Sequence, residues 1–230
     1  MAETGKDYVA VVYNETDRPF TEYPDLLARH LVERYQMIPG ARLLDLGCGR
    51  GEFLRGFLRC GMLGYGADQS QAAAQLCPDA EIRIANFENA TIPYDDGFFD
   101  VVYSKSVLEH FYYPERLVRE IHRVLKPGGL VITMVPDWEH NYRIYYEDYT
   151  HRTPFTLSSL CDIQLIHGFE QVQVERFRQL PFLWKMPWLA PLCSLLAMIT
   201  PSATRYHSKL IRFSKEVMLL ASAVKPAAQK

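Results

Sequence analysis

Leu43-Leu44-Asp45-Leu46-Gly47-Cys48-Gly49-Arg50-Gly51-Glu52-Phe53 is the stretch that decides the fold, because an apolar strand runs here into a glycine-rich turn and then into a helix. Glycines let the backbone turn tightly and approach a ligand where a Cβ would intrude. A dinucleotide-binding fingerprint would instead read G-x-G-x-x-G and set a pyrophosphate on the helix N-terminus. Asp45 and Glu52 would repel a pyrophosphate, so the turn favours a cationic ligand. A purely structural turn is the alternative.

Outward from this stretch, strand and helix patterns alternate along the chain. The expected strands cover residues 41–46, 64–67, 81–85, 99–103, 130–135, 171–178 and 216–223. The expected helices cover residues 23–35, 51–60, a short segment from 70, 114–125 and 157–167. This alternation predicts an α/β fold with a parallel sheet and helices on both faces. Ligands of such folds bind beyond the carboxyl ends of the strands.

Length and composition favour one domain over residues 1–230, since 230 residues with 48% hydrophobic side chains can bury a full core. Within it we expect an N-terminal helical segment at 1–37, a catalytic core formed by 38–178 and 214–225, and an insertion at 179–213. Five cysteines without C-x-x-C spacing, and no leader before them, predict reduced thiols in a cytoplasmic protein. The charge is uneven, with −9 over residues 1–174 and +7 over 175–230.

Two further motifs follow the second and third expected strands. Asp68 closes the strand pattern about twenty residues after the glycine turn, the spacing at which a carboxylate reaches a ribose diol. Its alternative role is an N-cap for the helix expected from Ser70. Asn86 and Phe87 follow the third strand, where a side-chain amide and the adjacent backbone can read an adenine edge.

These motifs resemble, in their order along the chain, the motifs of class I S-adenosylmethionine-dependent methyltransferases. Three further stretches belong to the same ordered set: Phe98-Phe99-Asp100-Val101-Val102, Val107-Leu108-Glu109-His110 and the turn Lys126-Pro127-Gly128-Gly129. The resemblance covers about residues 41–135. It implies a Rossmann-like, mostly parallel seven-stranded sheet whose last strand is antiparallel and follows the apolar insertion. It also implies S-adenosyl-L-methionine as cofactor, S-adenosyl-L-homocysteine as product, and no metal.

The resemblance assigns cofactor contacts to individual positions. Gly47 and Gly49 are expected to flank the methionine moiety, Asp68 to hold both ribose hydroxyls, and Asn86 with Phe87 to read adenine. Family members usually carry Asp where this chain has Asn86, and an amide adds no charge. The full expected set is Asp45, Gly47, Cys48, Gly49, Asp68, Gln69, Asn86, Phe87 and Ser104.

The expected proton chemistry lies in residues 147–156, which crowd His, Asp, Arg and Tyr into one segment. His151 is the predicted base because the pKa of histidine lies near neutrality, with Asp148 as its orienting partner. His110 is the alternative base. Two other interpretations stay open: Asp148 and His151 cap the helix that begins near Thr156, or His110 is a buried packing residue.

The acceptor is less clear from sequence than the cofactor. Tyr103-Ser104-Lys105-Ser106 is not the Asn/Asp-Pro-Pro-Tyr/Phe signature of amino methylation on nucleic-acid bases, and no Pro-Cys pair is present, so a nucleic-acid acceptor is disfavoured. The Asp-Tyr-Thr-His segment ending at His151 resembles methyltransferases of bacterial polysaccharide and glycolipid assembly. That favours O-methylation of a small-molecule acceptor that is sugar-containing or lipid-linked. N- or C-methylation of another small molecule, or a catalytically silent cofactor-binding protein, are the alternatives.

Residues 180–213 form an apolar insertion that the α/β pattern does not predict. Three prolines and a lysine interrupt residues 180–200, so the apolar run is shorter than the ~20 residues of a membrane span. We expect an apolar loop followed by a basic amphipathic helix carrying Arg205, Lys209 and Arg212. This pattern predicts peripheral contact with the inner face of the cell membrane. A lid over the active site or a homodimer contact would look the same in sequence.

Overall fold

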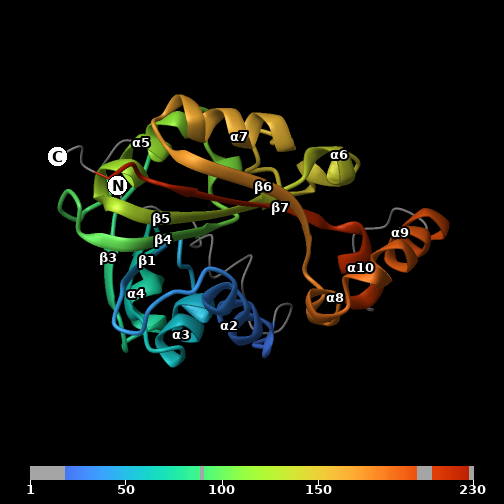
Figure 1. The fold of residues 1–230 in the computed structure, drawn as a ribbon, viewed down its shortest axis with the longest axis horizontal. Coiled ribbons are helices and arrows are strands. Elements are labelled where there is room, and N and C mark those ends of the chain that lie inside the picture. The colour runs from blue at the N-terminus through green and yellow to red at the C-terminus, as the bar shows by residue number, and fades with distance from the viewer. Residues whose placement is uncertain (1–18, 89–90, 201–208, 228–230) are drawn as a thin grey trace, which may run out of the picture. The chain divides into compact units, whose positions relative to one another are not determined.

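The computed structural model describes residues 19–88, 91–200 and 209–227 (Figure 1). The chain divides into two compact units, residues 1–104 with 123–129 and residues 105–122 with 130–230. The strands of the described residues form a seven-stranded sheet in the order β3-β2-β1-β4-β5-β7-β6. The Rossmann-like α/β fold predicted from sequence is confirmed. The single domain over 1–230 stays a prediction.

The first unit is built on parallel strands. β1 (Arg42–Leu46) pairs in parallel with β2 (Leu63–Asp68) and with β4 (Phe99–Lys105). β3 (Glu81–Ile84) extends the sheet beyond β2, also in parallel, and the short helix α4 (Ala72–Leu76) connects these two strands. β1 has a strand on either side, contains three leucines and is almost wholly buried, as expected for a strand covered on both faces.

Helices α2 (Tyr23–Arg34) and α3 (Glu52–Arg59) pack against each other in this unit (Figure 1). Leu27 and Leu31 of α2 are fully buried and lie one helical turn apart, which matches the predicted amphipathic helix. Gly56 of α3 allows the close approach, because a Cβ there would lie 2.9 Å from the Ala28 Cβ.

The second unit contains the antiparallel part of the sheet. β7 (Val217–Val224) pairs antiparallel with both β5 (Leu125–Pro136) and β6 (Glu170–Arg178). β7 is an apolar run and is buried nearly throughout, because strands flank it on both sides, whereas the edge strand β6 is largely exposed. Helix α7 (Leu157–Ile166) packs on β6 and β7, and α5 (Pro114–Val124) precedes β5 (Figure 1).

Thr156 and Ser159 determine where α7 begins. The Thr156 hydroxyl accepts a hydrogen bond from the Ser159 backbone nitrogen at 3.3 Å, and the Ser159 hydroxyl accepts one from the Thr156 nitrogen at 2.9 Å, so the two form a capping box. The interpretation that Asp148 and His151 cap this helix is therefore wrong.

The insertion is helical where we expected an apolar loop. It contains α8 (Pro181–Lys185), a 3-10 turn at Pro187–Leu189, α9 (Ala190–Ile199) and α10 (Lys209–Lys215) (Figure 1). Each proline lies at the first or second position of its helix, where the missing N–H breaks no hydrogen bond. The prolines thus start helices instead of interrupting them. Arg205, named as part of the basic helix, lies outside the described residues.

Candidate functional site

The carboxyl ends of the parallel strands bring the expected cofactor residues to one edge of the sheet. Leu46 at the end of β1 pairs with Ala67 of β2 and with Ser104 of β4. Asp68 of β2 pairs with Ile84, the last residue of β3. The turns that follow these strands therefore start side by side, as the position of ligands in such folds requires.

The glycine turn holds its backbone open toward solvent at Gly49. Gly47 and Gly49 have positive φ angles of 75° and 51°, which favour glycine, and a Cβ on Gly49 would meet no atom within 4 Å. Gly51 has another role, because a Cβ there would lie 2.5 Å from the Cys77 Cβ. Gly47 and Gly49 therefore serve the turn at the strand ends, whereas Gly51 allows the close approach of Cys77.

Asp68 is a buried carboxylate that the surrounding backbone orients. One oxygen accepts a hydrogen bond from the Gly49 nitrogen at 2.7 Å, and the other accepts one from the Ser70 nitrogen at 2.8 Å. The N-cap of α4 is Gln71, which makes no side-chain cap, so the alternative role of Asp68 as a helix cap is not observed. The carboxylate is instead tied to the glycine turn.

The charge at this edge is negative, but for a different reason than the sequence suggested. Arg50 pairs with Glu52 at 2.8 Å, so the negative charge of Glu52 is compensated. Asp45 and Asp68 remain, and after burial these two carboxylates are the main causes that raise the pKa of the Cys48 thiol. The preference for a cationic ligand therefore rests on the two aspartates.

The other expected cofactor residues differ in exposure. Asn86 is exposed and its side-chain oxygen accepts a hydrogen bond from the Glu88 nitrogen at 3.0 Å, while Phe87 is buried. Gln69 is exposed. Ser104 is buried, and its hydroxyl has no hydrogen-bond partner among the described residues.

The Cys48 side chain is directed into the protein. A Cβ on Gly66 would lie 2.9 Å from the Cys48 sulfur, so this sulfur faces the strand β2 and is buried. All five cysteines of the chain are free thiols.

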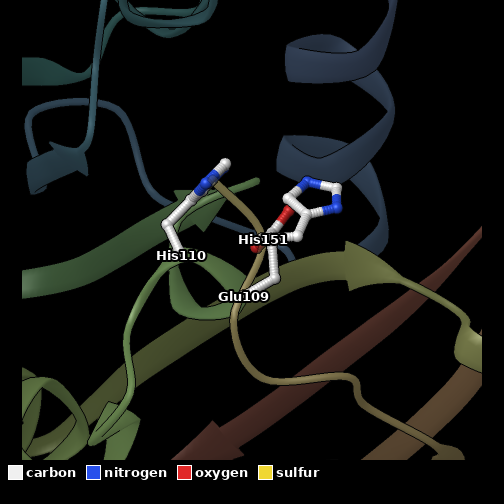
Figure 2. A group of neighbouring side chains, drawn as sticks. All are labelled: Glu109, His110 and His151. Atoms are coloured by element: carbon white, nitrogen blue, oxygen red, sulfur yellow. The ribbon is translucent and has the colours of Figure 1, made fainter. Parts of the chain in front are cut away.

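A second cluster lies in the other unit and contains Glu109, His110 and His151. One potential ligand atom from each side chain lies within 4.8 Å of the other two, and Figure 2 shows the three as neighbouring side chains. Glu109 and His110 belong to a 3-10 turn at Leu108–His110 that directly follows β4. The Arg152 and Thr153 nitrogens both donate to the Glu109 carbonyl, at 2.7 and 3.1 Å, which holds the segment of His151 against this turn.

Each histidine of the cluster is anchored through its Nδ1 atom. His151 Nδ1 lies 2.7 Å from the carbonyl oxygen of Tyr145, in a 3-10 turn at Tyr145–Glu147. His110 Nδ1 lies 2.9 Å from the Thr150 hydroxyl, which in turn donates to an Asp148 carboxylate oxygen. A carbonyl can only accept, and the Thr150 proton is already donated, so both Nδ1 atoms carry the proton. The Nε2 atoms therefore carry the lone pairs.

The ionisation of the cluster is set mainly by burial. Glu109 is 0% exposed, neither of its carboxylate oxygens has a partner of good hydrogen-bond geometry among the described residues, and burial raises its pKa to about 8. Burial, followed by the nearby His151, lowers the pKa of His110 to about 4. Burial also lowers the pKa of His151, although Asp148 opposes the shift. Both imidazoles are therefore neutral at pH 7.

The structure brings together the predicted proton-transfer residues but changes their partners. His151 bonds to the Tyr145 carbonyl, and Asp148 supports His110 through Thr150 instead of orienting His151 directly. Sequence reasoning missed Glu109, although it quoted the Glu-His pair as part of a motif. The signal that could have identified it is an acidic residue in an otherwise apolar turn directly after a buried strand.

Comparisons with known proteins agree with this architecture. Residues 44–133 match the family described as methyltransferase domain. Over 141 residues the chain is 30% identical to tRNA (carboxymethyluridine(34)-5-O)-methyltransferase ALKBH8 of Macaca fascicularis, covering 60% of this chain and 21% of that protein. It is 36% identical over 103 residues to an uncharacterized methyltransferase of Mycobacterium sp. (strain KMS), covering 44% of this chain and 41% of that protein. The chain thus spans less than half the length of these relatives.

A solved structure supports the fold over nearly the whole chain. The S-adenosylmethionine-dependent methyltransferase from Archaeoglobus fulgidus superposes with a TM-score of 0.68 at 20% identity, covering 95% of this chain and all of that chain. At this identity the likeness concerns the fold. Together with the matched segment, it supports the class I methyltransferase architecture that the sequence motifs predicted.

Proposed function

We propose that this chain, which has the class I fold and a segment matching methyltransferase domains, is an S-adenosylmethionine-dependent methyltransferase that methylates a hydroxyl of a sugar-containing or lipid-linked small molecule. The observation that carries the reaction is the buried Asp68 carboxylate bonded to the Gly49 nitrogen at 2.7 Å. Such a carboxylate suits a ribose diol, and Gly49 presents open backbone beside it. No dinucleotide fingerprint competes for the same turn.

Other residues of the strand ends fit the remaining parts of the cofactor. Asp45 and Asp68 supply negative charge that suits the sulfonium and the amino group. The Ser104 hydroxyl, which has no hydrogen-bond partner in the described part of the chain, can bond a polar atom of the cofactor. Phe87 supplies an apolar contact for adenine, and Asn86 can offer its amide nitrogen, since its oxygen is used by the turn.

Methyl transfer to a hydroxyl needs a group that takes up the proton, because the cofactor supplies only its own leaving group. In the second unit, His151 and His110 are neutral at pH 7 and present Nε2 lone pairs. We assign proton removal to His151, whose Nδ1 is fixed by the Tyr145 carbonyl, with His110 as the alternative. Asp148 then acts as a positioning residue for His110 through Thr150.

A cationic pocket in the second unit supports an acceptor that carries phosphate. The cavity has a volume of about 340 Å³, and its lining carries four cations and two carboxylates, namely Arg143, Arg178, Arg212, Lys215, Glu139 and Glu216. Arg212 is paired with Glu216 at 2.8 Å. Arg178 donates one guanidinium hydrogen bond to the Ser194 hydroxyl at 3.0 Å, while its buried Nε has no hydrogen-bond partner among the described residues. Guanidinium groups bind phosphate oxygens with two parallel bonds. A pyrophosphate or phosphate of a lipid-linked acceptor fits this lining.

Helix α9 supports an acceptor that also carries a lipid. Its apolar side chains face solvent, with Met198 82% and Ile199 72% exposed, and Trp188 of the preceding turn is 72% exposed. None of the described helices is long and apolar enough to cross a bilayer. An exposed apolar helix beside a cationic pocket suits contact with a membrane surface. A lid or a homodimer contact would cover the same side chains.

Changing Met198 and Ile199 together to Asp should lower binding to anionic vesicles by about tenfold, because burial of two such side chains is worth about 1.5–3 kcal/mol each when complete and less at an interface. Vesicle sedimentation measures the effect. Ile166→Asp on α7 is the matched control, since Ile166 is 75% exposed but lies away from α9. Equal sedimentation of wild type and the double variant would favour the lid or the homodimer.

An RNA acceptor is the second candidate, because ALKBH8 is described as a tRNA methyltransferase and residues 175–230 carry a charge of +7. Methylation of nitrogen or carbon in another small molecule and a catalytically silent protein complete the alternatives. The absence of the base-amino methylation signature and the exposed apolar helix favour the lipid-linked acceptor.

Transfer of a labelled methyl group into lipid-linked glycan extracts, compared with bulk tRNA, tests the proposal. We expect label in the lipid fraction, and about tenfold less label with Arg178→Gln because one charge-assisted contact to phosphate is lost. The same variant should bind S-adenosylmethionine like wild type. Lys185→Gln is the control, since Lys185 is an exposed cation that does not line the pocket. Label confined to tRNA would replace the proposed acceptor, and no label in either fraction would favour a silent protein.

A further inference from the structure

We propose that Glu109, His110 and His151 form a binding site for one divalent transition-metal ion. One potential ligand atom from each lies within 4.8 Å of the others, and the three side chains are neighbours (Figure 2). Two donors on one ion with bonds of about 2.0–2.2 Å lie at most about 4.4 Å apart, so small movements of the side chains would bring all three onto one ion. The sequence motifs led us to expect no metal, so the inference departs from that expectation.

The hydrogen bonds of the two histidines are those of metal ligands. Imidazoles that bind metals usually donate their other N–H to a carbonyl or a carboxylate, which fixes the tautomer and the ring orientation. His151 Nδ1 does so to the Tyr145 carbonyl at 2.7 Å, and His110 Nδ1 to the Thr150 hydroxyl at 2.9 Å. The Thr150 hydroxyl in turn donates a hydrogen bond to the Asp148 carboxylate. The lone pair of each ring then lies on Nε2, the nitrogen that would bind an ion.

Glu109 supplies the second, independent observation. Its side chain is fully buried, and neither carboxylate oxygen has a partner of good hydrogen-bond geometry among the described residues. Buried polar groups in native proteins are nearly always hydrogen-bonded, and a buried charge is paired or coordinates a metal. Burial raises the pKa of Glu109 to about 8, although Lys105 and Ser106 oppose the shift. A cation beside it would satisfy both oxygens and keep the carboxylate ionised.

The donor set indicates which ions fit. Imidazole suits Zn²⁺, Co²⁺ and Fe²⁺, whereas Mg²⁺ and Ca²⁺ prefer oxygen ligands. Two histidines and one carboxylate also form only part of a coordination shell, as in catalytic sites that keep an open position. A consequence that rests on the proposed function is that this position would take the acceptor oxygen and lower the pKa of its hydroxyl. His151 would then act as a ligand in the metal-loaded protein.

Titration of the chelator-treated, dialysed full chain with Co²⁺, followed by visible absorption and calorimetry, tests the site without cofactor or acceptor. We expect one ion per chain and an absorption band from coordinated Co²⁺. Glu109→Gln, which keeps the shape of the side chain but removes its charge, should weaken binding at least tenfold. Thr150→Val should weaken binding about tenfold, because the contact to His110 Nδ1 is lost while all three ligands remain.

Glu147→Gln is the matched control, because Glu147 is an exposed carboxylate of the same segment and should leave Co²⁺ affinity unchanged. The melting temperature of each variant shows whether it is folded. Absence of the absorption band with the wild type, or equal affinity in folded Glu109→Gln and Thr150→Val, would overturn the inference. Because neither S-adenosylmethionine nor an acceptor is present, this result is separate from any failure of methyl transfer.

Discussion

Asp68→Ala is expected to lower the affinity for S-adenosylmethionine by about 10²–10⁴-fold, because two charge-assisted hydrogen bonds to the ribose hydroxyls contribute about 1.5–3 kcal/mol each. The carboxylate is held for this role by the Gly49 and Ser70 nitrogens, at 2.7 and 2.8 Å. Calorimetric titration with S-adenosylmethionine measures the change. Asp68→Asn should lie between wild type and the alanine variant, since it keeps one acceptor oxygen and loses the charge.

Asp79→Asn is the control for this experiment, because Asp79 is an exposed carboxylate of the same unit and should leave the affinity unchanged. The alanine variant also loses two bonds to backbone nitrogens, so its melting temperature must be measured before its affinity is interpreted. Wild-type affinity in a folded Asp68→Ala protein would remove the ribose assignment. Tighter binding of NAD than of S-adenosylmethionine by the wild type would point to an oxidoreductase instead.

The parallel sheet could be predicted because its strands are short apolar runs between turn residues. β1 starts one residue later than expected and ends where expected, and β2 extends one residue beyond its expected bounds at each end, since glycines and charged residues flank these strands. β5 was predicted to start at Leu130, but it starts at Leu125. The Arg123 and Val124 carbonyls accept hydrogen bonds from Gly97 and Phe98, and such pairing between distant segments leaves no local pattern.

The gathering of the expected cofactor residues at one edge of the sheet could be predicted for the same reason. Each of them lies at the carboxyl end of a strand or in the segment that follows it, and parallel strands bring such residues together whatever their separation in sequence. Charge pairing is the part that sequence reasoning got wrong, because Glu52 and Arg50 meet through side-chain rotamers that the order of residues does not specify.

The second cluster was only half predictable. The sequence shows which histidines are candidates for proton chemistry. It does not show that residues 109–110 contact residues 150–153, because these segments lie about forty positions apart and meet through backbone hydrogen bonds to the Glu109 carbonyl. Through this contact His110 is linked to Asp148 by the Thr150 hydroxyl, and the buried Glu109 lies near both imidazole rings. Sequence periodicity carries no information on such loop-to-loop packing.

His151→Ala is expected to lower kcat by about 10²–10⁴-fold, because a positioned general base contributes about this factor and water replaces it poorly in a half-buried site. The affinity for S-adenosylmethionine should stay close to that of wild type, since the expected ribose and methionine contacts belong to residues of the other unit. Steady-state methyl transfer to the identified acceptor, together with calorimetry, separates the two quantities. His151→Gln should recover little activity, because an amide cannot accept the proton.

His167→Ala is the control, because this histidine ends α7 in the same unit without belonging to the cluster, and its variant should turn over like wild type. His110→Ala and the double variant complete the cycle. If the two imidazoles act as one unit, as base and support or as ligands of one ion, the double variant should lose little more than His151→Ala alone. Fully additive losses would mean that the histidines act independently. Unchanged kcat in His151→Ala would transfer proton removal to His110, and unchanged kcat in both single variants would leave alignment of the acceptor with the methyl group as the source of catalysis.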